Sequence, residues 1–105
     1  MRSLTVRELK RMFRENKDIQ IIDVREDYEM DSVPFEDAIH IPLFDIRTSL
    51  TRISKLKDVI FVCRSGHRSL AAVEYLSTLG FNNTYNLDGG LVAWSKKIDK
   101  NLKVE

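Results

Sequence analysis

The chain has 105 residues, 43% of them hydrophobic and 31% charged, and its 17 basic and 16 acidic side chains leave a formal net charge of +1. This length and composition predict one domain, residues 1–105, and the near-zero charge argues against nucleic acid or an anionic membrane as a partner. No apolar run approaches the roughly 20 residues of a membrane span, and a single cysteine cannot form an intramolecular disulfide, so a reducing compartment, the cytoplasm, is expected.

The first half of the chain predicts one helix and two strands. Thr5 followed by Glu8 is a capping-box pattern. Apolar residues then recur at helical spacing: Val6, Leu9, Met12 and Phe13. Residues 19–24 are rich in β-branched side chains without clean alternation, which is typical of a strand covered on both faces. The acidic stretch that follows predicts only a weak strand at 38–41, which Pro42 would end.

The next predicted elements alternate between helix and strand. Apolar residues between 46 and 53 favour a short helix, and residues 59–62 form the clearest strand, apolar throughout, at the expected centre of a sheet. Periodic apolar residues at 72–79 predict a helix that Gly80 closes, because glycine adopts the left-handed conformation of a C-terminal cap. Residues 84–87 predict a short strand.

The last predicted element is a helix with Leu91, Trp94 and Ile98 at near-helical spacing, after a tight turn at 88–90. Strands that alternate with helices indicate the α/β class. We therefore expect a central, mostly parallel β-sheet with helices on both faces.

Cys63 lies where the strand at 59–62 ends and a polar loop leads into the next helix. The carboxyl ends of parallel strands are where open α/β sheets build sites, and a helix N-terminus offers free N–H groups and a positive dipole end to an anion. Arg64, His67 and Arg68 add positive charge. This setting favours the thiolate over the thiol and predicts a reactive nucleophile. The alternative is an inert core cysteine.

The length of the loop at 63–68 indicates the size of the group that it can bind. Four residues separate Cys63 from Arg68, and Gly66 among them can take the positive φ of a tight loop. A cysteine phosphatase would need five spacer residues to wrap a tetrahedral phosphate, and the position of its arginine is Ser69 in this chain. A smaller ring of N–H groups suits a single atom, such as the outer sulfur of a persulfide. The loop therefore favours sulfur transfer.

Four segments, in this order along the chain, resemble the rhodanese family. They are Ile-Ile-Asp-Val-Arg-Glu at 21–26 with Tyr28-Glu29, Ala-Ile-His-Ile-Pro-Leu at 38–43, Val-Cys-Arg-Ser-Gly-His-Arg-Ser at 62–69, and Leu-Asp-Gly-Gly-Leu-Val-Ala-Trp at 87–94. The resemblance implies a single rhodanese-like domain and a sulfurtransferase of the thiosulfate type. Its Cys63 persulfide would carry a sulfane sulfur from thiosulfate, a persulfide or a polysulfide to a thiol, a protein or cyanide.

The resemblance assigns the catalytic role to Cys63 and the active-site loop to residues 63–68. The candidate substrate-binding residues are Arg64, Ser65, Gly66, His67, Arg68 and Ser69. Arg68 has an alternative role, in which it braces the loop by pairing with a carboxylate. Ser69 has one as a helix cap. His67 is expected to point to solvent, because an already ionised thiolate needs no base.

Two further features follow from the resemblance. Asp23 and Arg25, at the same sheet edge as Cys63, belong to a structural signature whose side chains tie neighbouring loops together. The chain departs from the family at 31–38, where Asp-Ser-Val-Pro-Phe-Glu-Asp-Ala replaces the usual Gly-His-Ile-Pro-Gly-Ala. The departure affects the local backbone and one rim of the pocket rather than the activity class.

Two alternatives from other function classes stay open. The first is a cysteine-dependent phosphatase or arsenate-reductase-like enzyme, which the missing fifth spacer residue disfavours. The second is a non-catalytic interaction module, which the presence of Cys63 disfavours. No cofactor or metal is expected, because His40, His67 and Cys63 fall short of the four ligands of a structural zinc site.

Overall fold

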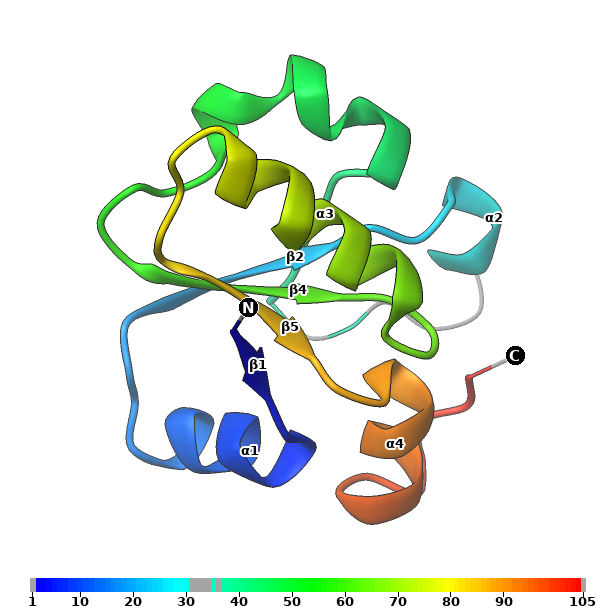
Figure 1. Ribbon diagram of the computed structural model, residues 1–105. Coiled ribbons are helices and arrows are strands. Elements are labelled where there is room, and N and C mark those ends of the chain that lie inside the picture. Colours follow the sequence, from blue (N-terminus) through cyan, green and yellow to red (C-terminus); the bar gives the residue numbers. More distant parts are fainter. Residues whose placement is uncertain (1, 31–34, 36, 105) are drawn as a thin grey trace.

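In the computed structural model, which describes residues 2–30, 35 and 37–104, five parallel strands form one sheet in the order β1-β5-β4-β2-β3 (Figure 1). The strands are β1 (Ser3–Leu4), β2 (Ile19–Asp23), β3 (Ile39–His40), β4 (Asp58–Val62) and β5 (Thr84–Leu87). The predicted α/β class is confirmed, and so is the central position of β4.

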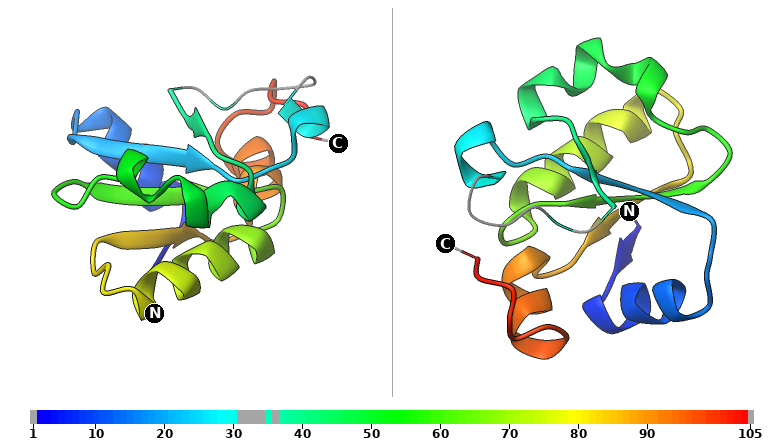
Figure 2. Two further views of the ribbon diagram at one scale, coloured as in Figure 1. Left: turned by 90° about the horizontal axis from the view of Figure 1, so that it is seen from above. Right: turned by 180° about the vertical axis from the view of Figure 1, so that it is seen from behind.

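Helices cover both faces of this sheet, as expected (Figure 2). They are α1 (Val6–Arg14), α2 (Asp27–Met30), the 3-10 helices η1 (Leu43–Thr48) and η2 (Leu50–Arg52), α3 (His67–Thr78) and α4 (Gly90–Lys97). One core joins the sheet to α3, η1 and the end of η2, and the other joins it to α1 and α4. None of the described helices has the length and apolar character that a membrane span requires.

The start of α1 follows the predicted capping box. The Thr5 hydroxyl accepts the Glu8 N–H at 3.1 Å, and the Glu8 carboxylate accepts the Thr5 N–H at 3.0 Å. These hydrogen bonds lower the pKa of Glu8, because they favour the ionised carboxylate. The predicted end of α3 is also confirmed, since Gly80 follows the helix with φ of 92°.

Four local elements differ in part from the expectations. The sequence did not predict β1 or α2, and the short helix expected at 46–53 is present as two 3-10 helices, η1 and η2. The strand expected at 38–41 pairs with β2 only at Ile39–His40. The departure from the family pattern at 31–38 falls mostly outside the described residues.

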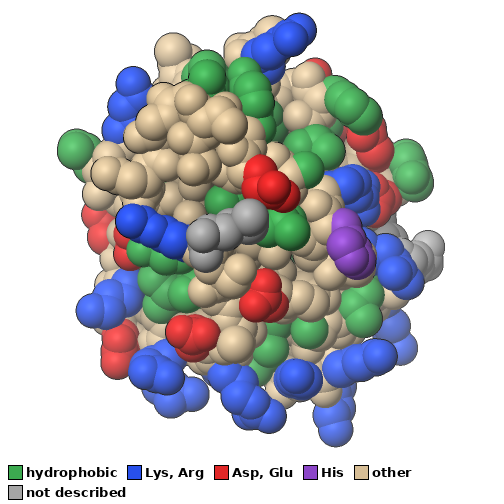
Figure 3. Space-filling view, in the orientation of Figure 1, with side chains coloured by type: hydrophobic (Ala, Val, Ile, Leu, Met, Phe, Trp, Pro, Cys, Tyr) green, Lys and Arg blue, Asp and Glu red, His purple; other side chains and the backbone are tan. Residues whose placement is uncertain are grey.

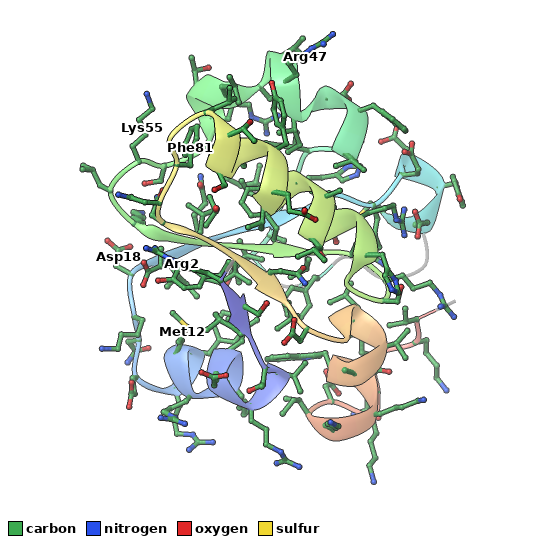
Figure 4. The ribbon with its side chains drawn as sticks, in the orientation of Figure 1. Arg2, Met12, Asp18, Arg47, Lys55 and Phe81 are labelled. Carbon is green, nitrogen blue, oxygen red and sulfur yellow. The ribbon has the colours of Figure 1, made fainter. Side chains whose placement is uncertain are left out.

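The amino and carboxyl ends of the parallel strands carry different side chains. At the amino edge, Figure 4 shows Lys55 beside Phe81, with the ammonium 5.8 Å from the ring centroid, and Lys57 pairs with Asp18 at 3.1 Å. At the carboxyl edge, β4 runs directly into Cys63. The Lys and Arg side chains that gather along the lower edge of the molecule in Figure 3 lie over α1 and α4.

Candidate active site

Strand β4 directs the Cys63 side chain toward α3. Alternate residues of a strand face opposite sides, and Val59 and Phe61 share the α3-side core with Cys63, whereas Ile60 and Val62 belong to the other core. Cys63 is only 1% exposed. The thiol therefore lies beneath the loop, at the carboxyl edge of the sheet.

The loop wraps hydrogen-bond donors around the sulfur. The Gly66 N–H points at Cys63 Sγ from 3.1 Å, and the Ser69 N–H from 3.4 Å. Gly66 has a φ of 97°, in the left-handed region that glycine tolerates, and it is the residue before α3. The sulfur thus sits where a tight turn meets a helix N-terminus, and this environment favours negative charge on it.

Ser69 does not cap α3, which corrects the capping alternative. The helix begins two residues earlier, at His67, because Gly66 makes the turn, so Ser69 lies within the first helical turn. Its hydroxyl oxygen is 3.3 Å from Cys63 Sγ, and its hydroxyl donates to Asn86 Oδ1 on β5. Asn86 is registered opposite Phe61 and so faces the same side of the sheet as Cys63.

The first turn of α4 holds the loop from behind. The Leu91 N–H donates to the Cys63 carbonyl and the Val92 N–H to the Arg64 carbonyl, both at 2.9 Å. A Cβ atom on Gly90 would lie 2.5 Å from the Cys63 carbonyl oxygen and 2.6 Å from that of Arg64. Gly90 therefore allows the start of α4 to approach the backbone of Cys63 and Arg64. This role goes beyond the tight turn that the sequence predicts.

Arg68 pairs with Glu29 of α2. Its guanidinium holds both carboxylate oxygens, at 2.5 and 2.9 Å, and the Glu26 N–H donates to Glu29 Oε1 at 2.9 Å. The pair lowers the pKa of Glu29 to about 2 and raises the pKa of Arg68, through the hydrogen bonds and charges of each partner. The structure thus favours the bracing alternative for Arg68.

Replacing Glu29 with glutamine is expected to lower stability in a pH-dependent way. Because the Glu29 pKa is depressed from 4.5 to about 2, the pair stabilises the fold fully above about pH 5 and loses that effect as the pH falls toward 2. We expect a loss of about 1 to 2 kcal/mol at pH 7, since the Arg68 side chain is partly exposed. Thermal unfolding from pH 7 to pH 2 measures it.

The matched control is Glu74→Gln, at an exposed position on α3. Its effect on the free energy of unfolding should be small at every pH. A Glu29→Gln deficit that stays constant down to pH 2 would contradict the ion-pair account.

The remaining loop residues lie at the surface. Arg64, Ser65 and His67 are exposed, and the His67 ring Nδ1 is 3.1 Å from the Ser65 hydroxyl. The prediction that His67 points to solvent is confirmed. These three side chains form the mouth of the loop, above the buried sulfur.

Asp23 and Arg25 form a buried ion pair, as their predicted bracing role requires. Arg25 Nη2 is 2.8 Å from the Asp23 carboxylate, which also accepts the Arg25 backbone N–H at 3.0 Å. The His40 ring Nε2 lies 2.6 Å from the Arg25 carbonyl oxygen, and this contact links the backbone just after β2 to β3.

Three hollows among the described residues lie away from Cys63. One of about 770 Å³ lies against α1 and α4 and is lined in part by Phe13, Phe35 and Trp94. It contains no residue of the loop 63–69, and neither do the hollows beside Phe81 and beside Phe44. Among the described residues, no three His, Cys, Asp or Glu side chains are grouped to hold a metal.

Sequence relationships agree with this geometry. A family model described as rhodanese-like domain matches residues 5–97. A putative sulfurtransferase, YtwF, of Bacillus subtilis is 35% identical over 90% of both chains, and a sulfurtransferase of Allochromatium vinosum is 33% identical over 84% of this chain and 82% of its own.

Solved structures resemble the fold along its whole length. A rhodanese-like domain protein from Staphylococcus aureus superposes with a TM-score of 0.86 and 36% identity, over 100% of this chain and 99% of that one. The sheet, loop and helices around Cys63 thus belong to a fold that this chain shares, over nearly the full length of both chains, with the Staphylococcus aureus protein.

Proposed function

The chain belongs to the rhodanese-like domain family, and we propose that it is a sulfurtransferase that carries sulfur as a persulfide on Cys63. The observation that carries the proposal is the environment of Cys63 Sγ, a buried sulfur that faces the N–H groups of Gly66 and Ser69. The likeness to relatives named sulfurtransferase supports the general class of reaction.

The loop at residues 63–69 suits a persulfide because it offers hydrogen-bond donors beyond the two N–H groups that face Sγ. The N–H groups of His67 and Arg68 belong to the first turn of α3, where a helix provides no acceptor of its own. A sulfur bonded to Sγ and lying in the mouth of the loop would carry the negative charge toward these groups and the dipole of α3.

In the first half-reaction, a Cys63 thiolate attacks the outer sulfur of the donor. The Sγ–S bond forms as the donor's S–S bond breaks, and the electron pair leaves on sulfite when the donor is thiosulfate, or on a thiolate or shorter polysulfide otherwise. Arg64, at the mouth, is placed to attract an anionic donor. Arg68 acts mainly by holding the loop against Glu29.

In the second half-reaction, an acceptor thiolate or cyanide attacks the outer sulfur of the persulfide. The bond to Sγ breaks, its electron pair returns to Sγ, and the Cys63 thiolate is regenerated. No oxidant, cofactor or metal enters this cycle. We propose that residues 1–105 form one rhodanese-like domain. Because the carrier thiol must be kept reduced between cycles, we place the protein in the cytoplasm.

Two observations weigh against a phosphatase. The loop has four residues between Cys63 and Arg68, and both Arg68 Nη atoms donate to the Glu29 carboxylate. The bidentate clamp on two phosphate oxygens is thus committed elsewhere. A non-catalytic module is disfavoured by the donors that surround Sγ, which binding alone would not require.

Steady-state kinetics test the proposal. Varying thiosulfate or a low-molecular-weight persulfide against cyanide or a thiol should give parallel double-reciprocal lines, because the donor leaves before the acceptor binds. An aryl phosphate assayed in parallel should show no turnover. Phosphate release with no sulfur transfer would favour the phosphatase and reject the proposal.

A further inference from the structure

A chain of polar side chains runs from the protein surface to Cys63. The exposed Asp88 carboxylate lies 3.5 Å from Asn86 Nδ2, and Asn86 Oδ1 lies 2.5 Å from the Ser69 hydroxyl oxygen. That oxygen is 3.3 Å from Cys63 Sγ. Ser69, Cys63 and Asn86 are buried, with exposures of 0%, 1% and 4%. The sequence analysis did not single out Asn86.

The Ser69 hydroxyl has one hydrogen and two neighbours that compete for it. Asn86 Oδ1 only accepts, and the contact of Nδ2 with Asp88 keeps Oδ1 turned toward Ser69, so the hydroxyl donates to Asn86. In that arrangement it faces Sγ with a lone pair. A thiol satisfies the lone pair by donating its S–H, whereas a thiolate does not.

We propose that the Ser69 hydroxyl hydrogen alternates between Asn86 Oδ1 and Cys63 Sγ, and that Asn86 is a positioning residue that competes with the thiolate for it. When Sγ carries the charge, the hydroxyl turns to Sγ as a third donor beside the N–H groups of Gly66 and Ser69. When Sγ is neutral, the hydroxyl returns to Asn86.

The catalytic consequence rests on the proposed function. In the persulfide the outer sulfur carries the charge and Sγ is neutral. The Ser69 hydroxyl therefore donates its hydrogen bond to Asn86 Oδ1. As the acceptor breaks the bond to Sγ, the electron pair arrives on Sγ and the hydroxyl rotates toward it. No proton leaves Ser69. The switch therefore stabilises Sγ at the moment it becomes a leaving group.

The test uses the pH dependence of alkylation of the single thiol by iodoacetamide, which requires no sulfur transfer. Ser69→Ala removes the third donor and should move the midpoint of the profile upward by about one pH unit. Asn86→Leu removes the competing acceptor and should move it downward. The double variant should behave like Ser69→Ala alone, because without the hydroxyl Asn86 has nothing to compete for.

The charged and titratable groups around Cys63 stay in place in all these variants. They are Arg64, His67 and Arg68 of the loop, Glu29 of α2, the Asp23–Arg25 pair at the end of β2, and Asp88 after β5. Their effects on the midpoint therefore cancel in the comparison. If Asn86→Leu does not fold, Asn86→Val, which is smaller and favourable in a strand, replaces it with the same expected shift.

The matched control is Asn83→Leu. Asn83 precedes β5 and its amide donates to the carbonyls of Ser54 and Lys57, at 2.8 and 2.7 Å, far along the sheet from Cys63. It should lower the melting temperature and leave the midpoint unchanged. Single variants at 69 and 86 that shift the midpoint in the same direction, or a double variant that keeps the downward shift, would overturn the proposal.

A single-turnover measurement of the two half-reactions completes the test. Ser69→Ala should slow sulfur release to the acceptor at least as strongly as it slows loading, and an effect on loading alone would contradict the switch. Failure of sulfur transfer in the parent protein would reject the proposed function, while the alkylation profiles would still decide the role of Asn86.

Discussion

A Cys63→Ser variant is expected to lose sulfur transfer by more than about a thousandfold, to the uncatalysed level, while its fold stays intact. A hydroxyl in place of the thiol can neither attack sulfane sulfur at a useful rate nor hold a persulfide. Initial rates with thiosulfate and cyanide measure the loss. Because Cys63 is the only cysteine in the chain, no second thiol can take over.

The control for this variant is its stability. The serine hydroxyl occupies the same buried site and accepts the same N–H groups, those of Gly66 and Ser69, so the free energy of unfolding should change by less than about 1.5 kcal/mol. Turnover retained by a folded Cys63→Ser variant would reject Cys63 as the carrier.

Replacing Gly90 with alanine should damage both stability and activity. The new Cβ would lie 2.5 Å from the Cys63 carbonyl oxygen and 2.7 Å from the Arg64 carbonyl carbon, and Gly90 has a positive φ of 61°. The atoms that it would meet belong to the backbone of Cys63 and Arg64, which cannot move aside as a flexible side chain can. We expect a loss of about 3 kcal/mol or more in the free energy of unfolding, with transfer reduced at least tenfold in the protein that remains folded.

Gly80→Ala separates the collision from the backbone strain. Gly80 also has a positive φ, 92°, but a Cβ there meets nothing within 4 Å. It should cost only about 1 kcal/mol, the strain of a left-handed alanine, and leave transfer at the parental rate. Equal losses in the two variants would mean that the contact between α4 and the loop is not what holds Cys63 in place.

The features that local sequence patterns could predict are those that local physics determines. The capping box at Thr5, the apolar strand before Cys63 and the closing turn at Gly80 each depend on residues a few positions apart. The two-residue β1 was missed because it exists only through pairing with β5, about 83 positions away in the sequence.

The site shows the same division. The sequence placed Cys63 in an N–H cradle, but the partners that define the side chains of Arg68 and Ser69 come from distant elements. Glu29 lies 39 positions from Arg68, and Asn86 lies 17 positions from Ser69. One signal was available, since Asn86 is a polar residue in a strand next to the one that ends at Cys63. Only the register of Asn86 with Phe61 shows that the Asn86 side chain lies on the same face of the sheet as Cys63.

The central claim, a persulfide on Cys63, is tested most directly by the intact mass of the protein after brief treatment with thiosulfate, a low-molecular-weight persulfide or a polysulfide. We predict a gain of one sulfur atom per chain, absent in Cys63→Ser, which cyanide removes with the release of one equivalent of thiocyanate. No gain of sulfur from any of the three donors, or an equal gain in the Cys63→Ser variant, would contradict the account.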